Sequence, residues 1–263
     1  MIRFSANLGF LWQELPLLAR IAAAATAGFE AVELHWPYDI PASDIRATCA
    51  QNGVQLLALN SPLGDIAKGE FGLGALPGRE KDFEASIDAA VTYCAAAGGT
   101  AVHVMAGLVD PVAVPAATDT FARNLEFAAD RAGAVGLGIL LEPLNQRDKP
   151  GYFYSTLAPA AALIERVGRK NVRLMLDVYH VGVSEGDITR KIERHLAIVG
   201  HVQLAAVPSR AEPDEGEIDY RDILRTLDRL GYTGWIGAEY RPRTTTDAGL
   251  AWRERLVGKG AGQ

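Results

Sequence analysis

The sequence predicts a single α/β domain of the (β/α)8 barrel class, spanning residues 1–263. Short apolar segments alternate with longer segments of helical periodicity from one end of the chain to the other, which is typical of repeated βα units. Eight such units begin about every 33 residues, which matches a closed barrel. An open doubly wound sheet would usually have fewer strands and a phosphate loop, and neither GxGxxG nor GxxxxGK followed by Ser or Thr occurs in the chain.

Each predicted strand is a short apolar run that lies between turn-forming or polar residues. In chain order, the predicted strands are Ile2–Ala6, Ala31–His35, Gln55–Asn60, Ala101–Met105, Leu137–Glu142, Val172–Asp177, Gly200–Leu204 and Trp235–Tyr240.

The segments between these strands have apolar residues at three- and four-residue spacing, which is typical of helices that bury one face. The clearest examples are Leu15–Ala27, Glu80–Ala97, Thr118–Ala134, Leu157–Val167 and Tyr220–Leu230. Glycines such as Gly28, Gly98, Gly168 and Gly231 follow helix ends, where a left-handed residue is favoured. Each of these turns leads into the next predicted strand.

The connection Ser61–Gly78 (SPLGDIAKGEFGLGALPG) is long and contains five glycines. It follows the third predicted strand, which places it at the carboxyl-terminal mouth of a barrel, where active sites of this fold lie. Long loops in compact domains are usually either functional or disordered. We interpret residues 61–78 as an active-site lid, with a surface excursion as the alternative. Lys68 and Glu70 are its polar residues expected nearest to a substrate.

Composition and charge argue against several other classes. The chain has 26 Lys+Arg and 32 Asp+Glu, a formal net charge of −6, whereas nucleic-acid-binding proteins usually have the opposite sign. No apolar run approaches the roughly 18 residues of a membrane span, and Arg3, Asn7, Gln13 and Glu14 interrupt the N-terminal segment. We therefore expect a cytoplasmic protein with no signal peptide, no membrane anchor and a small-molecule substrate.

The two cysteines, Cys49 and Cys94, lie in alanine-rich, helix-like segments without CxxC or metal-type spacing. We interpret both as reduced thiols in or near the core. A disulfide is the alternative, and it is uncommon in a cytosolic type of chain.

Oxygen-bearing side chains fall at the ends of four successive predicted strands. Glu142 ends GILLE, Asp177 ends VRLMLD, Gln203 lies in GHVQL and Glu239 lies in WIGAE. A single carboxylate at a strand end is more often a helix cap or a surface charge. Four oxygen-bearing side chains at the ends of successive strands, however, are expected to point into one barrel mouth. Buried carboxylates repel one another and lose hydration, and a divalent cation removes that cost. The four residues therefore predict one divalent metal site, with Mg²⁺ or Mn²⁺ favoured and Co²⁺ also suited to oxygen ligands.

Further polar residues near the predicted strand ends are candidates for binding a substrate. His180, in DVYH, is within reach of the same mouth, and a helix cap is the alternative. Arg210, in QLAAVPSR, supplies a fixed positive charge for a substrate carboxylate or hydroxyl, and a solvated loop arginine is the alternative. Four residues that end the first four strands are expected either to line the opposite wall or to be purely structural: Asn7, His35, Asn60 and His103.

Nine segments distributed along the chain are RFSANL, SPLGDIAKGE, ALPGRE, EPLN, DVYH, VGHVQLA, GEIDY, GWIGAEY and TTTDAGL. Together they resemble the hydroxypyruvate isomerase family, within the superfamily of sugar-isomerase and endonuclease IV-like barrels. The resemblance covers nearly the whole chain and is specific in order and spacing, whereas the short strand motifs alone identify only the superfamily.

This resemblance implies roles for the strand-end residues. In the family, the glutamate of EP-N, the aspartate of D-YH, the glutamine of GH-Q and the glutamate of the last-strand EY bind one divalent metal; here these are Glu142, Asp177, Gln203 and Glu239. Related ketose epimerases and isomerases use two glutamates as acid and base on opposite sides of the substrate, which implies these catalytic roles for Glu142 and Glu239.

The sequence departs from the family pattern at two places near the expected substrate pocket. Family members usually have Asp-Asn where this chain has Ala206-Val207, and an arginine where the lid has Phe71. These changes bear on the choice of substrate rather than on the metal ligands or the reaction class.

The resemblance implies an isomerase that moves a proton between adjacent carbons of a small hydroxy-oxo acid through a metal-stabilised enediolate. The expected reaction converts hydroxypyruvate to tartronate semialdehyde, or a 2-oxo-tetronate to its 3-oxo isomer. The main alternative is a ketose 3-epimerase or sugar isomerase of the same barrel type.

Two remote alternatives belong to other classes. An endonuclease IV-like phosphodiesterase would need a histidine-rich zinc cluster and a basic face, which five histidines and a net charge of −6 disfavour. A non-catalytic binding barrel would leave the four predicted ligands unexplained. The order in which the two glutamates act, and whether the chain forms a homo-oligomer, are left open.

Overall fold

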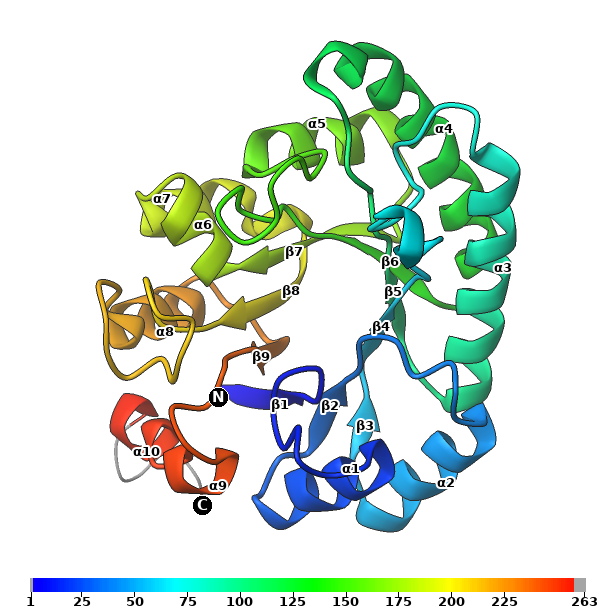
Figure 1. The fold of residues 1–263 in the computed structure, drawn as a ribbon. Coiled ribbons are helices and arrows are strands. Elements are labelled where there is room, and N and C mark those ends of the chain that lie inside the picture. The colour runs from blue at the N-terminus through cyan, green and yellow to red at the C-terminus, as the bar shows by residue number, and fades with distance from the viewer. Residues whose placement is uncertain (1, 258–263) are drawn as a thin grey trace.

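A computed structural model of the protein describes residues 2–257. Parallel strands form an inner ring and helices form an outer ring around it (Figure 1). The strand segments are β1 (Arg3–Asn7), β2 (Ala31–Glu33), β3 (Gln55–Leu56), β4 (Ala58–Asn60), β5 (Ala101–His103), β6 (Gly138–Leu141), β7 (Val172–Asp177), β8 (Val199–Leu204) and β9 (Trp235–Ala238). Their order in the sheet is β3-β2-β1-β9-β8-β7-β6-β5-β4.

The segments β3 and β4 are two parts of one barrel strand, interrupted at Leu57. β3 pairs with β2, and β4 pairs with β5. The Leu57 amide donates to the Val32 carbonyl at 2.9 Å, and the Leu57 carbonyl accepts from the amides of Thr100 and Ala101 at 3.0 Å. Leu57 is thus bonded to both neighbouring strands and closes the ring. The predicted (β/α)8 fold class is confirmed.

The outer layer contains ten α-helices and three short 3₁₀ helices among residues 2–257. The α-helices are α1 (Leu17–Thr26), α2 (Ala42–Asn52), α3 (Glu80–Ala97), α4 (Val114–Gly133), α5 (Leu157–Val167), α6 (Val178–Ser184), α7 (Ile188–His195), α8 (Tyr220–Arg229), α9 (Thr246–Gly249) and α10 (Trp252–Val257). The 3₁₀ helices are η1 (Ile66–Lys68), η2 (Pro111–Ala113) and η3 (Leu196–Ile198).

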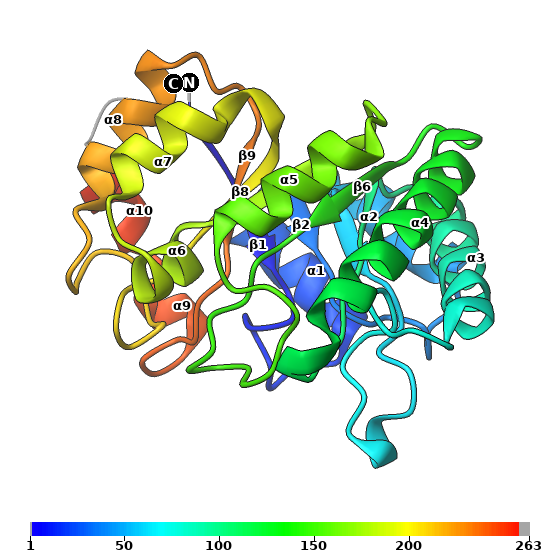
Figure 2. The ribbon, with the colours of Figure 1, turned by 90° about the horizontal axis from the view of Figure 1, so that it is seen from above.

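The loop 61–78 has an anchored base and a projecting tip. Gly72 and Ala106 form an isolated antiparallel bridge, and the amide of Gly74 donates to the Met105 carbonyl at 3.1 Å. Gly72 has φ +109°, and a Cβ there would lie 2.5 Å from the Met105 carbonyl oxygen, so glycine is needed for this close approach. The tip contains η1 and extends away from the barrel, in cyan in Figure 2. That the loop acts as a lid stays a prediction.

The two cysteines are free thiols, Cys49 in α2 and Cys94 in α3, and both are buried. Burial raises the pKa of Cys49 to about 11 and that of Cys94 to about 12, so both are neutral near pH 7. None of the described helices is long and apolar enough to span a membrane.

Candidate active site

A cavity of about 300 Å³ opens where the barrel strands end. Its walls carry residues from the carboxyl ends of β1, β4, β5, β6, β8 and β9, so side chains from around the ring face one space. Most of the predicted site residues line it: Asn7, Asn60, Glu142, His180, Gln203, Arg210 and Glu239, together with His35 and His103.

Three buried carboxyl groups lie close together here, with one guanidinium between two of them. Glu142 and Glu239 line the cavity, whereas Asp177 does not line it but lies beside His180 and Arg210, which do. Glu142, Asp177 and Glu239 are 4%, 2% and 6% exposed, so their charges are largely removed from water. Arg210 Nη2 lies 2.7 Å from Glu239 Oε1 and 3.8 Å from Asp177 Oδ2. The structure therefore brings together the acidic residues that the sequence placed at separate strand ends.

Several buried oxygen atoms of this cluster have no hydrogen-bond partner. Within residues 2–257, these include Glu142 Oε1, Asp177 Oδ2 and Gln203 Oε1. Leaving a buried acceptor without a donor costs about 1–3 kcal/mol, and more when the group is charged. Glu142 and Asp177 each offer a ligand atom within 4.8 Å of the other, and carboxylate oxygens of this kind fit a divalent metal ion.

The titration behaviour of the same groups supports this fit. Burial raises the pKa of Glu142 well above its ordinary range, and the charges of Glu239 and Asp177 add to the effect. Burial also raises the pKa of Asp177 to about 6 and that of Glu239 to about 8, although Arg210 opposes both shifts. The carboxyl groups cannot all ionise in this environment without additional positive charge.

The side-chain amide nitrogen of Gln203 donates two hydrogen bonds that fix the orientation of this side chain. Gln203 Nε2 donates to Glu33 Oε2 at 2.8 Å and to Glu239 Oε2 at 2.5 Å. The flipped amide would place an oxygen against two carboxylates, so Oε1 has to face the other way. Glu33 in turn accepts from Ser5 Oγ at 2.6 Å and lies 3.0 Å from His201 Nε2.

Glu33 is a site residue that the sequence reasoning missed. Burial acts to raise its pKa, but His201 and the hydrogen bonds outweigh burial and lower it. A Cβ at Gly237 on β9 would collide with this carboxylate, so the glycine of GWIGAE leaves room for it. The available signal was the ionisable residue inside the apolar segment AVELH.

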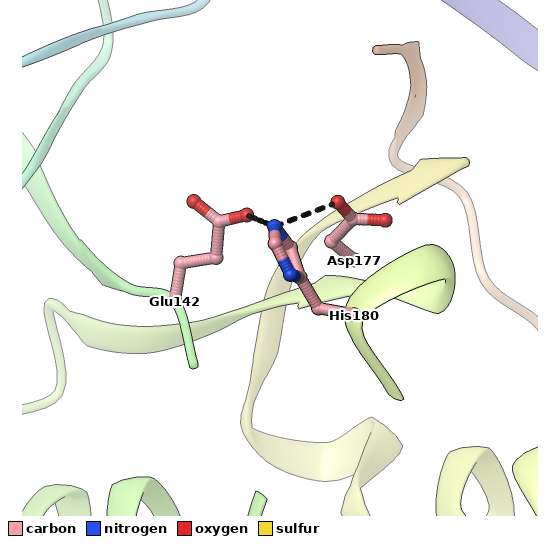
Figure 3. A group of neighbouring side chains, drawn as sticks. All are labelled: Glu142, Asp177 and His180. Carbon is pink, nitrogen blue, oxygen red and sulfur yellow. Dashed lines mark ion pairs between the residues drawn. The ribbon is translucent and has the colours of Figure 1, made fainter. Parts of the chain in front are cut away.

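The imidazole of His180 lies between the carboxyl groups of Glu142 and Asp177 (Figure 3), and one ligand atom from each residue lies within 4.8 Å of the others. His180 Nε2 is 3.7 Å from Glu142 Oε1 and 3.6 Å from Asp177 Oδ2. His180 Nδ1 accepts from the backbone amide of Asn145 at 3.0 Å and lies 2.7 Å from its side-chain Nδ2. The ring proton is therefore on Nε2, so His180 suits a hydrogen-bond donor better than a metal ligand.

The neutral state of His180 has an electrostatic cause as well. Burial lowers its pKa well below the ordinary range, and the charge of Arg210 lowers it further. The sequence gives no sign of a role for Asn145 beyond its place in EPLN, because its partner His180 lies 35 residues further along the chain.

The remaining predicted wall residues support the carboxyl groups. Asn7 Nδ2 donates to Glu239 Oε2 at 2.8 Å. Asn60 Oδ1 lies 3.2 Å from His103 Nδ1, which is itself 3.5 Å from Glu142 Oε2. Burial lowers the pKa of His103 to about 3, so this ring is neutral.

The structure does not bring Lys68 and Glu70 to the cavity. The Lys68 side chain is 79% exposed and pairs with Asp65 at 3.0 Å. Glu70 pairs with Arg79 and accepts from the Asp65 amide at 2.6 Å. Both charges are therefore satisfied by neighbouring residues, and Phe71, the next residue along the loop, lines the cavity instead.

The fold and the acidic site at the barrel mouth define a class of barrel enzymes. Residues 21–256 match the family model of the xylose isomerase-like TIM barrel, and the chain belongs to that family. It is 45% identical over 265 residues to a 2-oxo-tetronate isomerase of Cupriavidus necator, covering 98% of this chain and 100% of that one. It is 36% identical over 260 residues to the hydroxypyruvate isomerase of Escherichia coli, covering 97% and 99%.

A crystal structure described as an AP endonuclease, family 2, from Brucella melitensis matches with a TM-score of 0.94 and 42% identity, covering 97% of this chain and 99% of that one. Together with the curated relatives, these matches place the protein in the hydroxypyruvate isomerase family, and it is an isomerase. The predicted family and enzyme class are confirmed.

Proposed function

We propose that the protein is a divalent-metal-dependent isomerase that interconverts the 2-oxo and 3-oxo forms of a small hydroxy-oxo acid in the cytoplasm. Hydroxypyruvate and 2-oxo-tetronate are the first substrates to test, because relatives at 36% and 45% identity carry these names. The structural observation that supports the proposal is the set of buried, unpartnered oxygens on Glu142, Asp177 and Gln203 at the carboxyl ends of the strands.

In this proposal Glu142, Asp177, Gln203 and Glu239 hold one divalent ion. The ligand set contains only carboxylate and amide oxygens, which favours Mg²⁺ or Mn²⁺ and is compatible with Co²⁺. When bound, the ion supplies Lewis-acid stabilisation for negative charge on neighbouring substrate oxygens. His180 Nε2–H donates a hydrogen bond to a substrate oxygen, and Arg210 adds positive charge beside Glu239.

Glu142 and Glu239 are the proposed acid and base. One carboxylate removes the proton from the carbon that bears the hydroxyl group, and the electron pair forms an enediolate. The other carboxyl group returns a proton to the neighbouring carbon, and the hydroxyl proton moves to the former carbonyl oxygen, so that the carbonyl and the hydroxyl exchange places. The two residues follow β6 and β9, with β7 and β8 between them, and so approach the cavity from different sides.

The proposal is tested by adding Mg²⁺ or Mn²⁺ to metal-free protein and offering it hydroxypyruvate, 2-oxo-tetronate and free ketoses in D₂O. Proton NMR then follows both product formation and exchange of the migrating proton. We expect turnover of a hydroxy-oxo acid that chelator abolishes and metal restores. Turnover of ketoses alone would favour the epimerase or sugar-isomerase alternative, and turnover that is indifferent to chelator would contradict metal dependence.

The acid and base roles are tested with Glu142→Gln and Glu239→Gln. Each variant is expected to reduce kcat by at least about 10²-fold, because one proton-transfer group is lost. Metal occupancy is measured at saturating metal, so that lost chemistry is distinguished from lost metal. Glu193→Gln is a matched control, because Glu193 pairs with Arg229 on the outer surface. Full activity of either active-site variant would refute its assigned role.

A further inference from the structure

Lys149 is a cationic residue of the cavity that the proposed function does not use. It lines the same cavity as Glu142 and Glu239, and it is half-buried. Its ammonium lies 3.5 Å from the centroid of the Phe71 ring. No carboxylate of residues 2–257 forms an ion pair with it, whereas Arg210 is paired with both Glu239 and Asp148. Lys149 thus brings an uncompensated positive charge to the cavity.

The backbone that carries Lys149 is held in place by its neighbours. The Lys149 amide donates to the Asn145 carbonyl at 3.0 Å, and Asn145 Oδ1 accepts from the Asp148 amide at 2.8 Å. Gln146 accepts from the Gly151 amide at 2.7 Å and donates to the Tyr152 carbonyl at 2.9 Å. Because Asn145 also bonds to His180, one turn positions both the imidazole and the lysine.

The aromatic contact holds the ammonium without neutralising it. Phe71 packs edge-on against Trp36 and Tyr152, with centroids 6.2 Å and 6.3 Å away. A cation over a ring face keeps its full charge and can still donate hydrogen bonds to an anion on its other side. An ion pair with a protein carboxylate would have removed this capacity.

The distribution of charge in the cavity indicates which part of a substrate would lie next to Lys149. The buried part of the cavity holds three carboxyl groups, those of Glu33, Glu142 and Glu239, and its one buried cation among the described residues, Arg210, is already paired with Glu239. An anionic substrate therefore binds most favourably when its own carboxylate lies beside a cation that is away from these carboxyl groups. Its hydroxyl and oxo oxygens then face Glu142, Glu239 and His180.

We infer that Lys149, held over Phe71, binds the carboxylate of the substrate and makes the site selective for hydroxy-oxo acids over neutral ketoses. This inference rests on the proposed function and deepens it. Arg241 lines the same cavity near Phe10, 5.9 Å from that ring, and also lacks an ion pair within residues 2–257. It is therefore the rival cation that the test has to separate from Lys149.

The experiment compares substrates that differ only in the carboxylate. Hydroxypyruvate is paired with dihydroxyacetone, and 2-oxo-tetronate with erythrulose. In Lys149→Met we expect kcat/KM for the acids to fall by about 10- to 100-fold, mainly through KM, because one charge-assisted hydrogen bond is lost. The values for the neutral ketoses should not fall. Lys149→Arg should retain most of the selectivity, because the charge is kept.

A binding measurement independent of turnover uses glycerate and glycerol, which the enzyme cannot isomerise by this reaction. Calorimetric titration of the metal-loaded protein should show that glycerate binds more tightly than glycerol. The Lys149→Met substitution should raise the Kd for glycerate by about 10-fold and leave the Kd for glycerol unchanged. Lys81→Met is the matched control, because this lysine is exposed on α3 and does not line the cavity.

The outcomes separate this inference from the proposed function. If the wild-type protein turns over no hydroxy-oxo acid, the proposed function fails and the inference fails with it. If the acids are turned over but Lys149→Met keeps the wild-type selectivity and glycerate affinity, only the inference is wrong. If Arg241→Met loses the selectivity while Lys149→Met does not, the carboxylate binds to the rival cation.

Discussion

At the scale of single residues, the carboxyl groups of the cavity carry the clearest consequence for stability. A carboxyl group whose pKa is raised by folding stabilises the protein only while it is protonated. For Glu239 this contribution is complete below the unfolded value near 4.5 and is lost as the pH rises through about 8. Metal-free protein should therefore lose stability between pH 7 and 8.5.

Thermal melts in chelator check this expectation. Tm is expected to fall as the pH rises from 7 to 8.5, and saturating Mn²⁺ should reduce that fall because ionised carboxylates are then compensated. His35 and His103, whose pKa values burial lowers to about 4 and 3, are neutral throughout this window and add no slope of their own in the folded state. Glu239→Gln removes the titrating group and should flatten the slope. A flat wild-type profile in chelator would contradict the prediction.

The sequence predicted those site residues that directly end or follow a strand. Glu142, Asp177 and Gln203 lie at the strand ends as predicted, because parallel strands in a barrel all end at one mouth, whereas their role as metal ligands stays a prediction. Glu33 and Lys149 were not found. Glu33 accepts a hydrogen bond from Gln203, 170 residues away, and Lys149 lies over Phe71, and only the folded chain makes these contacts.

At the scale of elements, the loop 61–78 combines a fixed base with a tip that has few partners. The base is bonded to residues 105 and 106, and it carries Phe71 into the cavity wall. The tip contains η1, in which Ile66 is 69% exposed. If the loop is a lid, the tip is the part that closes over substrate and excludes water from the enediolate.

Shortening the tip tests the lid without disturbing its base. Replacing Ile66–Lys68 with Gly-Ser keeps Phe71 and Gly72 on their anchors. We expect kcat to fall several-fold and more substrate label to wash out into solvent, with metal affinity almost unchanged, because the intermediate becomes exposed to water. Val135→Ser, in an exposed turn between α4 and β6, is the control. Wild-type turnover and label retention in the shortened variant would make the loop a surface excursion.

Elements were predicted best where the burial pattern is strong. α3 and α5 have the predicted bounds, and the other three predicted helices are present with shifted ends. α4 begins at Val114, four residues before the predicted start, because Pro115 is well tolerated in a first helical turn. α2 was not among the predicted helices, since it buries only Ile45 and Cys49 and its apolar pattern is weak. The break at Leu57 had no signal in the sequence.

At the scale of the whole molecule, the barrel depends on the seam between its first and last strands. β1 pairs with β9 in parallel. Trp252 of α10 is fully buried over this seam, with its ring centroid 4.9 Å from that of Phe4, and its Nε1 donates to the Tyr240 hydroxyl at 3.0 Å. One side chain therefore contacts both the first strand and the segment that follows the last strand.

Removing this side chain should loosen the whole ring. Trp252→Ala is expected to lower the free energy of unfolding by about 3–5 kcal/mol, the range for truncation of a large buried aromatic residue. Chemical denaturation followed by circular dichroism measures the change. Trp252→Phe keeps a ring but loses the hydrogen bond, so it should lie between wild type and Trp252→Ala. A loss below about 1 kcal/mol in Trp252→Ala would show that the seam is held by the strands alone.

The hydrogen bond between Asn7 and Glu239 spans 232 residues, and this has a consequence for how the enzyme is made. On the ribosome, β1 emerges first, but the last proposed metal ligand is added only after β9 has been synthesised. A nascent chain that has reached α8 already contains most of the barrel and still has an incomplete ligand set. Premature termination anywhere before Glu239 would therefore yield a protein without the full site rather than one with reduced activity.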